Sequence, residues 1–400
     1  MLRVFALVLF VAVISASLNL RAGIASVGSV LDQVIAYYDA PAWVGGVITA
    51  IPGTLFFLVG ICAVPIARRF GLTPVILGAA GLLTAGLGLR PFAPDIAMFL
   101  LATVGAAGAI ALMNVLLPAW IKQHGGRYIV ALTTVYSVTL GLSSAAGPLS
   151  ALVTPSWQSA LGLWAVTAVV QLAVWVFVLF KFGRDIPGSK ASTPQDGAVA
   201  TPEAPVWKSL TAVALMLFFG LQSTSAYIQM GWLPAIFIDA GVAPSTAATG
   251  LGLLGAVGMV GGLVLPTVIS RARTLTPLVV LFALSTATGY LGLYFAPAAS
   301  PLGWSFLLGF GGCCFPLAIA LIPARTRDPL VTARLSGFVQ PVGYVLAATG
   351  PLLIGVAYGR IGEFQPILIA LVIMALVMGA VGIVAARHVV IDDELSVASR

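Results

Sequence analysis

Charged residues are scarce in this sequence: only 8% of its 400 residues are Asp, Glu, Lys or Arg, while 60% are hydrophobic. A soluble globular domain has about a quarter of its residues charged. The shortage therefore excludes an ordinary soluble domain and indicates that most of the surface faces the lipid bilayer. The net charge of +7 does not indicate nucleic-acid binding, because the basic residues are scattered singly and in pairs between apolar runs.

Cysteine and histidine are also scarce, which narrows the possible chemistry. Cys62, Cys313 and Cys314 lie in apolar stretches without the spacing of a metal site or a disulfide framework. His124 and His388 lie at the ends of apolar runs. No nucleophile–base pair, phosphate-binding loop or added soluble domain can be recognised. We therefore expect no metal, no cofactor and no enzyme activity.

Long apolar runs are abundant, and they define the fold class. A spanning helix needs about 20 apolar residues, and twelve such runs can be separated, the first over 3–31 and the tenth over 300–323. They are too uniformly apolar for the alternating strands of an outer-membrane barrel. Ser15-Ala16-Ser17 resembles a signal-peptide cleavage site, but the apolar run continues beyond it. The sequence therefore predicts an all-α membrane protein with twelve transmembrane helices and a retained first span.

The basic residues orient these spans. If the N-terminus is cytoplasmic, cytoplasmic loops and tails hold 16 of the 19 basic residues, outer loops hold only Arg90 and Arg360, and Arg21 is left inside a span. Positive charge accumulates on the cytoplasmic side of membrane proteins. We therefore expect a multi-pass protein of a bacterial inner membrane with both termini in the cytoplasm.

The chain divides into two similar halves. The polar segment 183–206 is rich in Pro, Gly, Ser and Thr, as flexible linkers are. Three short matches relate the halves at nearly constant offsets: Asp32 with Asp239, the Pro118 region with the Pro323 region, and Ala146–Leu149 with Thr349–Leu352. These features predict a parallel repeat of two six-helix bundles. The expected units are an N-terminal bundle at 1–182, the linker at 183–206, a C-terminal bundle at 207–390 and a cytoplasmic tail at 391–400.

Arg21 is the first candidate functional residue. It lies 18 residues after Arg3, about 27 Å along a helix at roughly 1.5 Å per residue. It could therefore reach the outer surface, but the apolar run continues to Asp32. No carboxylate is predicted inside any span, and a charge within a span needs water, protein or a counter-ion. A guanidinium without an acidic partner suits an anionic substrate, which it can bind through two charge-assisted hydrogen bonds.

Other polar residues in the spans complete the candidate binding site. Gln340 and Tyr344 are four residues apart and share one helix face. Each such residue could instead join neighbouring helices, but together they come from spans that can converge on a central cavity. The predicted substrate-binding set is Arg21, Asn19, Asn114, Tyr136, Gln222, Tyr227, Gln340 and Tyr344.

Short motifs recur along the spans: Leu18–Arg21 with Ser26–Gly28, Asn114–Pro118, Trp157 with Leu161–Trp164, Gly220–Ser223 with Trp232–Pro234, Gln340–Tyr344 and Gly350–Gly355. Together these motifs resemble the cyanate and 2-nitroimidazole permease family of the major facilitator superfamily. Ala22 and Ser29 stand where that family has prolines, which leaves the identity of the substrate open.

The loop after the second span resembles another feature of the superfamily. Arg68-Arg69-Phe70-Gly71 is similar to a loop that gates the cytoplasmic side, although the usual Asp is missing. The alternative is that Arg68 and Arg69 are simple positive anchors at the cytoplasmic surface.

The resemblance implies a secondary transporter with a substrate site between the two bundles. The favoured substrate is a small anion such as cyanate, bound by Arg21. The alternative is export of a neutral nitro-aromatic compound, stacked on Tyr136, Tyr227 and Tyr344. Because Asp32 and Asp239 lie at outer helix ends, we expect uniport or coupling through the charge of the substrate. We also expect a monomer.

Overall fold

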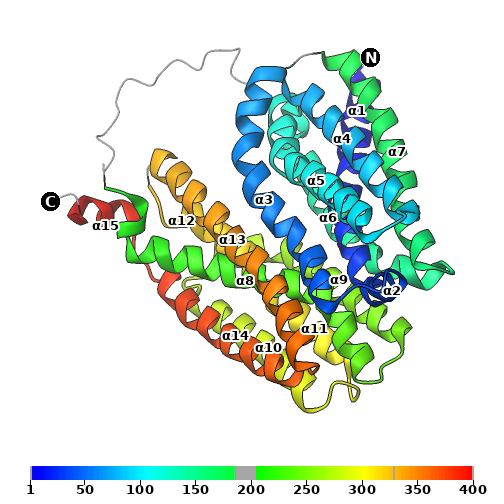
Figure 1. Ribbon diagram of the computed structural model, residues 1–400. Coiled ribbons are helices and arrows are strands. Elements are labelled where there is room, and N and C mark those ends of the chain that lie inside the picture. The colour runs from blue at the N-terminus through cyan, green and yellow to red at the C-terminus, as the bar shows by residue number, and fades with distance from the viewer. Residues whose placement is uncertain (1, 184, 186–203, 328, 399–400) are drawn as a thin grey trace, which may run out of the picture.

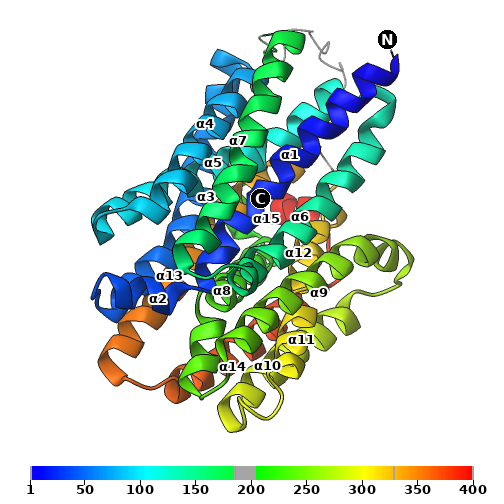
Figure 2. The same ribbon diagram turned by 90° about the vertical axis from the view of Figure 1, so that its right-hand side faces the viewer.

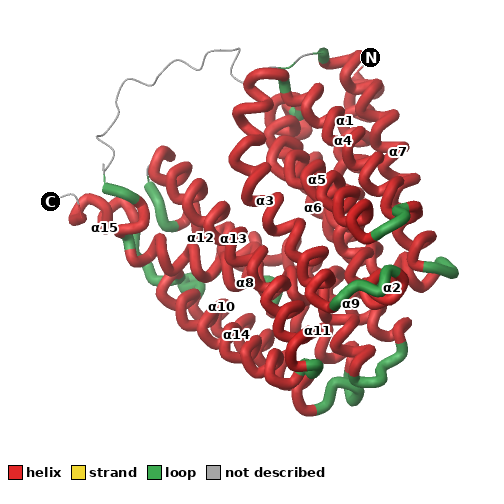
Figure 3. The backbone as a smooth tube through the Cα atoms, in the orientation of Figure 1, coloured by secondary structure: helices red, strands yellow, loops and turns green. Residues whose placement is uncertain are grey.

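The computed structural model describes residues 2–183, 185, 204–327 and 329–398. Within this part of the chain, Figure 3 shows helices joined by loops and no strand. Short 3-10 turns precede or follow several helices at Arg90–Phe92 (η1), Gly126–Tyr128 (η2) and Val206–Lys208 (η3). The α-helices are α1 (Leu2–Gly28), α2 (Leu31–Tyr37), α3 (Ala42–Phe70), α4 (Leu72–Leu89), α5 (Ile96–His124), α6 (Ile129–Val153), α7 (Trp157–Phe182), α8 (Leu210–Asp239), α9 (Pro244–Arg271), α10 (Thr276–Phe295), α11 (Pro301–Gly311), α12 (Cys314–Ala324), α13 (Pro329–Ile361), α14 (Gln365–Ala385) and α15 (Ile391–Ala398).

The expected twelve spans are confirmed. In the described part of the chain, twelve helical segments are long and apolar enough to cross a membrane, the shortest being Ala42–Gly60 with 19 residues. Helices α1 to α7 form one bundle, and α8 to α14 form the other (Figures 1 and 2). Most of the predicted linker lies at 186–203, outside the described residues.

Each bundle has its own apolar core, and two helix pairs join the bundles. Trp120 and Trp175 are buried in the first bundle, and Phe218 and Phe282 in the second. Helix α3 packs beside α13, and α6 packs beside α9. We call the end where the first helix of each bundle begins the terminal end, because both chain ends lie there, and the opposite end the distal end.

The first span ends three residues earlier than expected. Helix α1 stops at Gly28, and Asp32 lies in the separate short helix α2 at the distal end. The stop coincides with a close crossing, because a Cβ added at Gly28 would lie 1.7 Å from the carbonyl oxygen of Met230 in α8. Only glycine lets the two backbones approach this closely.

The tenth span is two helices rather than one. Helices α11 and α12 meet at Gly312 and Cys313, four and three residues before Pro316. A proline inside a helix has no N–H and displaces the carbonyl four residues earlier, which here belongs to Gly312. That carbonyl accepts a hydrogen bond from the Phe315 amide at 3.0 Å and a second, longer one from Gln222 Nε2 of α8 at 3.4 Å, so the backbone group that the proline displaces remains bonded.

The bundles meet closely in the distal half of their interface. A Cβ added at Gly46 in α3 would lie 3.0 Å from the carbonyl oxygen of Pro351 and 3.1 Å from the Cα atom of Gly355, both in α13. Further toward the terminal end, a Cβ at Gly60 of α3 or Gly337 of α13 would meet nothing within 4 Å. The same two helices therefore touch at the distal end and separate toward the terminal end.

The segment predicted as a C-terminal tail forms the docked helix α15. Its Ile391 and Leu395 are buried against the second bundle. The carboxylate of Glu394 accepts hydrogen bonds from the hydroxyl of Ser209 and from the amide and hydroxyl of Thr211, at 3.2 and 2.8 Å for Thr211. Glu394 thus caps the first turn of α8, where free N–H groups and the helix dipole favour a negative charge.

Candidate functional site

Arg21 lies where helices of both bundles meet. Its half-buried side chain extends from α1, interacts with the hydroxyl of Tyr227 on α8, and is close enough to Tyr136 on α6 and Tyr344 on α13 for electrostatic interaction. No carboxylate forms an ion pair with Arg21 among the described residues. Three predicted site residues from three other helices therefore lie around the guanidinium of Arg21.

Aromatic rings form the distal wall of this site. Phe56 of α3 stacks on Tyr344 with ring centroids 5.5 Å apart, and it lies 6.5 Å from the ring of Tyr227. Phe219 of α8 approaches Tyr344 edge-on at 5.3 Å. The two contacts of Phe56 cross between the bundles at the point where the closed distal half begins. The sequence analysis missed Phe56 and Phe219, because an isolated phenylalanine in an apolar run carries no signal of function.

Two predicted amides remain only partly bonded. Gln340 Nε2 donates to Ser336 Oγ at 2.8 Å, and Asn114 Nδ2 donates to the carbonyl oxygen of Ile110 at 3.0 Å. Both side chains are half-buried. Each amide carries two N–H groups and one oxygen, so each keeps a second N–H group for a ligand.

Asn19, by contrast, is bound within the first bundle. Its Nδ2 donates to the carbonyl oxygen of Ser15 and to Gln171 Oε1, at 3.1 and 2.9 Å, and its Oδ1 accepts a hydrogen bond from Thr167. Both N–H groups of the amide are therefore engaged, and the side chain is fully buried between α1 and α7. This geometry is that of a residue that joins two helices.

Two glutamines of the second bundle also make internal contacts. Gln222 is buried and donates to the carbonyl oxygen of Gly312 at the break between α11 and α12. Its Oε1 is buried without a hydrogen-bond partner in the described structure. Gln229 donates to Ser225 Oγ and to the hydroxyl of Tyr290, at 2.9 and 3.1 Å. Gln222 thus combines a structural bond with one free acceptor, whereas Gln229 joins α8 to α10.

The proposed gating arginines, Arg68 and Arg69, lie exposed at the terminal end of α3. The guanidinium of Arg69 lies 5.4 Å above the ring of the adjacent Phe70. Neither arginine forms an ion pair with any residue that the structure describes. The chain then turns at Gly71, whose φ of +96° favours glycine, and enters α4.

Asp185, which the sequence analysis did not single out, caps α4 at this turn. Its carboxylate accepts hydrogen bonds from the Thr73 amide at 2.6 Å and the Thr73 hydroxyl at 2.7 Å, and it pairs with His124 Nε2 at 2.7 Å. Burial acts to raise the pKa of Asp185, but the bonds from His124 and Thr73 together outweigh it and lower the pKa. Asp185 follows the end of α7, and it therefore links the start of α4 to the end of α5 within the first bundle.

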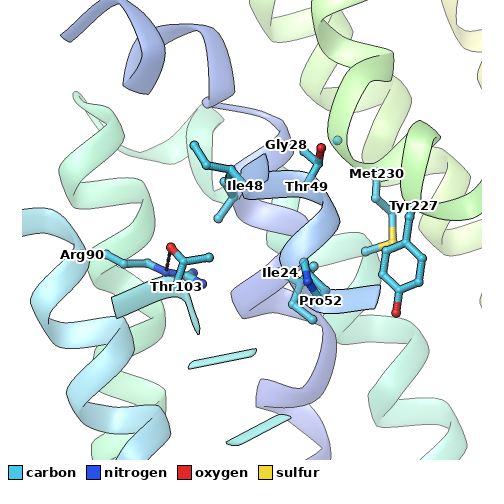
Figure 4. A pocket seen from close by; sticks show the side chains of 11 residues that line it. Ile24, Gly28, Ile48, Thr49, Pro52, Arg90, Thr103, Tyr227 and Met230 are labelled. Carbon is cyan, nitrogen blue, oxygen red and sulfur yellow. Dashed lines mark hydrogen bonds between the residues drawn. The ribbon is translucent and has the colours of Figure 1, made fainter. Parts of the chain in front are cut away.

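Arg90 lies in the connection between α4 and α5 at the distal end, within η1, but its side chain is buried and only 1% exposed. Its Nε donates to Thr103 Oγ1 at 3.1 Å, and its Nη1 donates to the carbonyl oxygen of Gly23 at 2.6 Å. Arg90 also lines a cavity that extends toward Tyr227 (Figure 4). The first bundle therefore holds a buried guanidinium in addition to the half-buried one of Arg21.

Comparisons with known proteins agree with this architecture. A sequence model of the Major Facilitator Superfamily matches residues 5–327. The chain is 32% identical to the 2-nitroimidazole transporter of Escherichia coli (strain K12) over 388 residues, which cover 95% of this chain and 96% of the relative. It is 24% identical to the cyanate transport protein of the same organism over 353 residues, which cover 87% and 89%.

A solved structure supports the same fold. The crystal structure of a peptide transporter in complex with sulfate has a TM-score of 0.74 and 14% sequence identity, and the match covers 96% of this chain and 95% of the other. At this identity the likeness concerns the fold alone. The chain therefore belongs to the Major Facilitator Superfamily, as a membrane transporter and not an enzyme, in the group that includes the 2-nitroimidazole and cyanate transporters.

Proposed function

We propose that this protein moves a small anion across the bacterial inner membrane by alternating access, with Arg21 as the anion-binding residue. The observation that carries the proposal is the environment of Arg21: three tyrosines and no carboxylate among the described residues. A partly buried charge of this kind is costly unless a counter-ion accompanies it. A bound anion would supply that counter-ion and take two charge-assisted hydrogen bonds from the guanidinium.

The tyrosines fit the same substrate. The hydroxyls of Tyr227, Tyr136 and Tyr344 can each donate a hydrogen bond to an anion held by Arg21. Asn114 and Gln340 keep one N–H group each for the same purpose. Asn19 and Gln222 would contribute indirectly, because their hydrogen bonds hold α1 and α8 in position against neighbouring helices. Among the named relatives, the cyanate transport protein supports an anionic substrate for this chain.

The direction of opening follows from the charges. Sixteen of the 19 basic residues fall in segments that the topology assigns to the terminal end. By the positive-inside rule we assign the terminal end to the cytoplasm. The close glycine contacts at the distal end and the separation toward the terminal end then correspond to a conformation open to the cytoplasm. The protein would act as a monomer, because each chain contains both bundles.

The test is counterflow of labelled cyanate in proteoliposomes. We expect Arg21→Gln to lower the exchange rate at least about 100-fold, equivalent to about 2.7 kcal/mol, while Arg21→Lys retains part of it because the charge remains. The matched control is Arg387→Gln, which removes an exposed charge at the terminal end. If Arg21→Gln exchanged cyanate at the wild-type rate, Arg21 would not be the anion-binding residue.

A second function is export of a neutral nitro-aromatic compound. The cluster of Phe56, Tyr344, Tyr227 and Phe219 favours it, because stacked and edge-on rings bind planar aromatic molecules. The 2-nitroimidazole transporter is the relative that supports it. Counterflow of cyanate against 2-nitroimidazole separates the two functions, since Phe56→Leu should impair the aromatic substrate more than the anion.

We also propose that transport does not require a proton gradient. None of the described carboxylates pairs with Arg21, and Asp32 and Asp239 lie at distal helix ends. Uptake should therefore respond to membrane potential according to the charge of the substrate. Strong stimulation by a pH gradient that disappears in Asp32→Asn or Asp239→Asn would contradict this coupling.

A further inference from the structure

Arg90 is a buried cation, and no acidic residue in the described part of the chain neutralises its charge. Its side chain is 1% exposed, and it forms no ion pair with any described residue. The two bonds that it makes, to Thr103 Oγ1 and the carbonyl oxygen of Gly23, leave its Nη2 group without a hydrogen bond in the described structure. A buried guanidinium usually pairs with an anion or uses all of its donors, so Nη2 is free to bind a further group.

A cavity lies between this guanidinium and Tyr227, a residue of the central site. Arg90 and Thr103 lie on one side of it, and Tyr227 and Met230 of α8 lie on the other, with Ile24 of α1 between them (Figure 4). Tyr227 is the residue whose hydroxyl interacts with Arg21. The same tyrosine therefore borders both the central site and the cavity of Arg90.

The geometry of α1 places this cavity directly distal to Arg21. Arg21, Ile24 and Gly28 are spaced three and four residues apart and so share one helix face. Along that face, Gly28 lies about 10 Å beyond Arg21 at roughly 1.5 Å per residue. Both Ile24 and Gly28 line the cavity. A solute that leaves Arg21 along this face toward the distal end passes Arg90 next.

We propose that Arg90 forms a second anion-binding position, on the distal side of the central site. The proposal rests on the proposed anion transport and adds a step to it: a small anion passes between the guanidinium of Arg21 and that of Arg90. Two positive charges in series let the anion exchange one partner for another instead of crossing an apolar wall. The same charges repel cations along the whole path.

The crossing of α1, α3 and α8 controls access to this position. In the present conformation the cavity volume is about 20 Å³, measured as the space in which the centre of a water molecule can lie. That space holds only one or two waters. The cavity is closed by the contacts of Gly28 with Met230 and of Gly231 with Thr49. An anion can occupy it only when these contacts separate, in the conformation open at the distal end.

Two substitutions separate the charge of Arg90 from its role as a brace. Arg90→Gln keeps a donor in reach of Thr103 but removes the charge and the bond to Gly23, whereas Arg90→Lys keeps the charge with fewer, differently placed donors. Arg360→Gln is the matched control, because Arg360 is an exposed arginine at the distal end of α13. The probe is labelled cyanate, measured both by counterflow in proteoliposomes and by equilibrium binding to the purified full-length chain.

We expect Arg90→Gln to lower cyanate exchange at least tenfold while changing the equilibrium dissociation constant less than threefold, because the central site remains. Arg90→Lys should restore exchange to within threefold of the wild type, and Arg360→Gln should equal the wild type. Wild-type exchange by Arg90→Gln would overturn the proposal. So would a lysine variant that exchanges no better than the glutamine variant, since Arg90 would then act only as a brace.

If the Arg90 variants fail to fold, Ile48→Glu and Ile48→Gln provide the second test. Ile48 lines the same cavity, and a carboxylate there can pair with the guanidinium of Arg90, whereas glutamine has nearly the same size without the charge. Exchange by Ile48→Glu should be at least tenfold slower than by Ile48→Gln, and equal exchange by the two folded variants would overturn the proposal. Failure of the proposed function gives a different result. The wild type itself would then exchange no small anion, which would rule out anion binding at both Arg21 and Arg90.

Discussion

The two halves of the interface between the bundles differ sharply in packing. At the distal end, α3 and α13 approach through Gly46 and Gly355 so closely that one added Cβ would lie about 3 Å from the facing backbone; toward the terminal end, Gly60 and Gly337 meet nothing within 4 Å. Phe56, Tyr227 and Tyr344 lie at the boundary between the halves. The candidate site around Arg21 therefore lies where close contact between the bundles begins.

The terminal end has contacts of another kind. Asp185 caps α4 within the first bundle, and Glu394 caps α8 within the second. The exposed pair of Arg327 with Asp393, 2.8 Å apart, also lies within the second bundle. These contacts strengthen each bundle separately and leave the two free to move relative to one another. Closure between the bundles therefore depends on the distal glycines.

The largest effect should come from filling a distal glycine. Gly46→Leu places a side chain against the backbone of α13, where close packing leaves no room for it. The conformation closed at the distal end should then be lost, and counterflow should fall more than about 100-fold, or about 2.7 kcal/mol. Gly60→Leu, in the same helix but facing open space, is the control and should transport within threefold of the wild type. Equal losses in both variants would contradict the comparison.

A smaller effect is expected at the boundary. Tyr227→Phe or Tyr344→Phe keeps the ring but removes a hydroxyl beside Arg21. A hydrogen bond to a charged group contributes about 1.5–3 kcal/mol, so the KM for an anion should rise about tenfold or more, while the KM for 2-nitroimidazole changes less. Tyr37→Phe, exposed at the distal end, should change neither value. Unchanged anion KM in both site variants would place the anion elsewhere.

The cap of the first bundle should affect stability rather than transport. Asp185→Asn weakens the bonds to Thr73 and His124, and we expect a loss of about 1–3 kcal/mol of unfolding free energy, seen as a lower Tm. Because the pKa of Asp185 is lowered, this stabilisation is present above the ordinary value of 3.8 and is lost as pH falls through the lower folded value.

The control for this cap is Asp95→Asn. Asp95 caps α5 through an exposed bond to the Met98 amide at 2.8 Å, so its loss should lower Tm less. Thermal unfolding of the purified protein between pH 7 and pH 3 measures both variants. A Tm difference between Asp185→Asn and the wild type that persists undiminished at pH 3 would contradict the assigned role of the ionised carboxylate.

The smallest effect should come from two like charges at the distal end. Partial desolvation and the nearby Asp239 raise the pKa of Asp32. A raised pKa means that the ionised carboxylate disfavours this closed conformation, and that protonation relieves the cost as pH falls through the raised value. Asp32→Asn should therefore favour distal closure and change the exchange rate less than threefold at pH 7. Asp39→Asn, also exposed, should have no effect, and a larger change there than at Asp32 would contradict the assignment.

Several elements of the site could be predicted from the sequence, and others could not. Arg21 stands out because a charge inside an apolar run is rare and costly. Phe56 does not stand out, since its role depends on meeting Tyr344 of the other bundle. The position of Arg90 in the connection between α4 and α5 could be predicted from the end of the apolar run, but the inward turn of its side chain to Gly23 could not.

Helix breaks show the same limit. Pro316 is visible in the sequence, and it accounts for the break after Gly312; Gln222, which adds a long hydrogen bond to the Gly312 carbonyl, lies 90 positions earlier in the chain. Likewise Asn19 looks like a ligand from its position beside Arg21, but its contacts with Thr167 and Gln171 bind it to α7. A polar residue in a span indicates that a hydrogen-bonding partner or ligand exists, but the sequence does not show which one it is.

The sequence by itself determined the class of this protein and its twelve spans, and it singled out Arg21 as a candidate, because apolar length and the cost of a lone charge are properties of a local segment. Only the tertiary structure decided which side chains lie near Arg21, that Arg90 is buried, and that the bundles touch at the distal end. These features depend on the rotation and crossing of helices, which are set by packing between residues far apart in the chain.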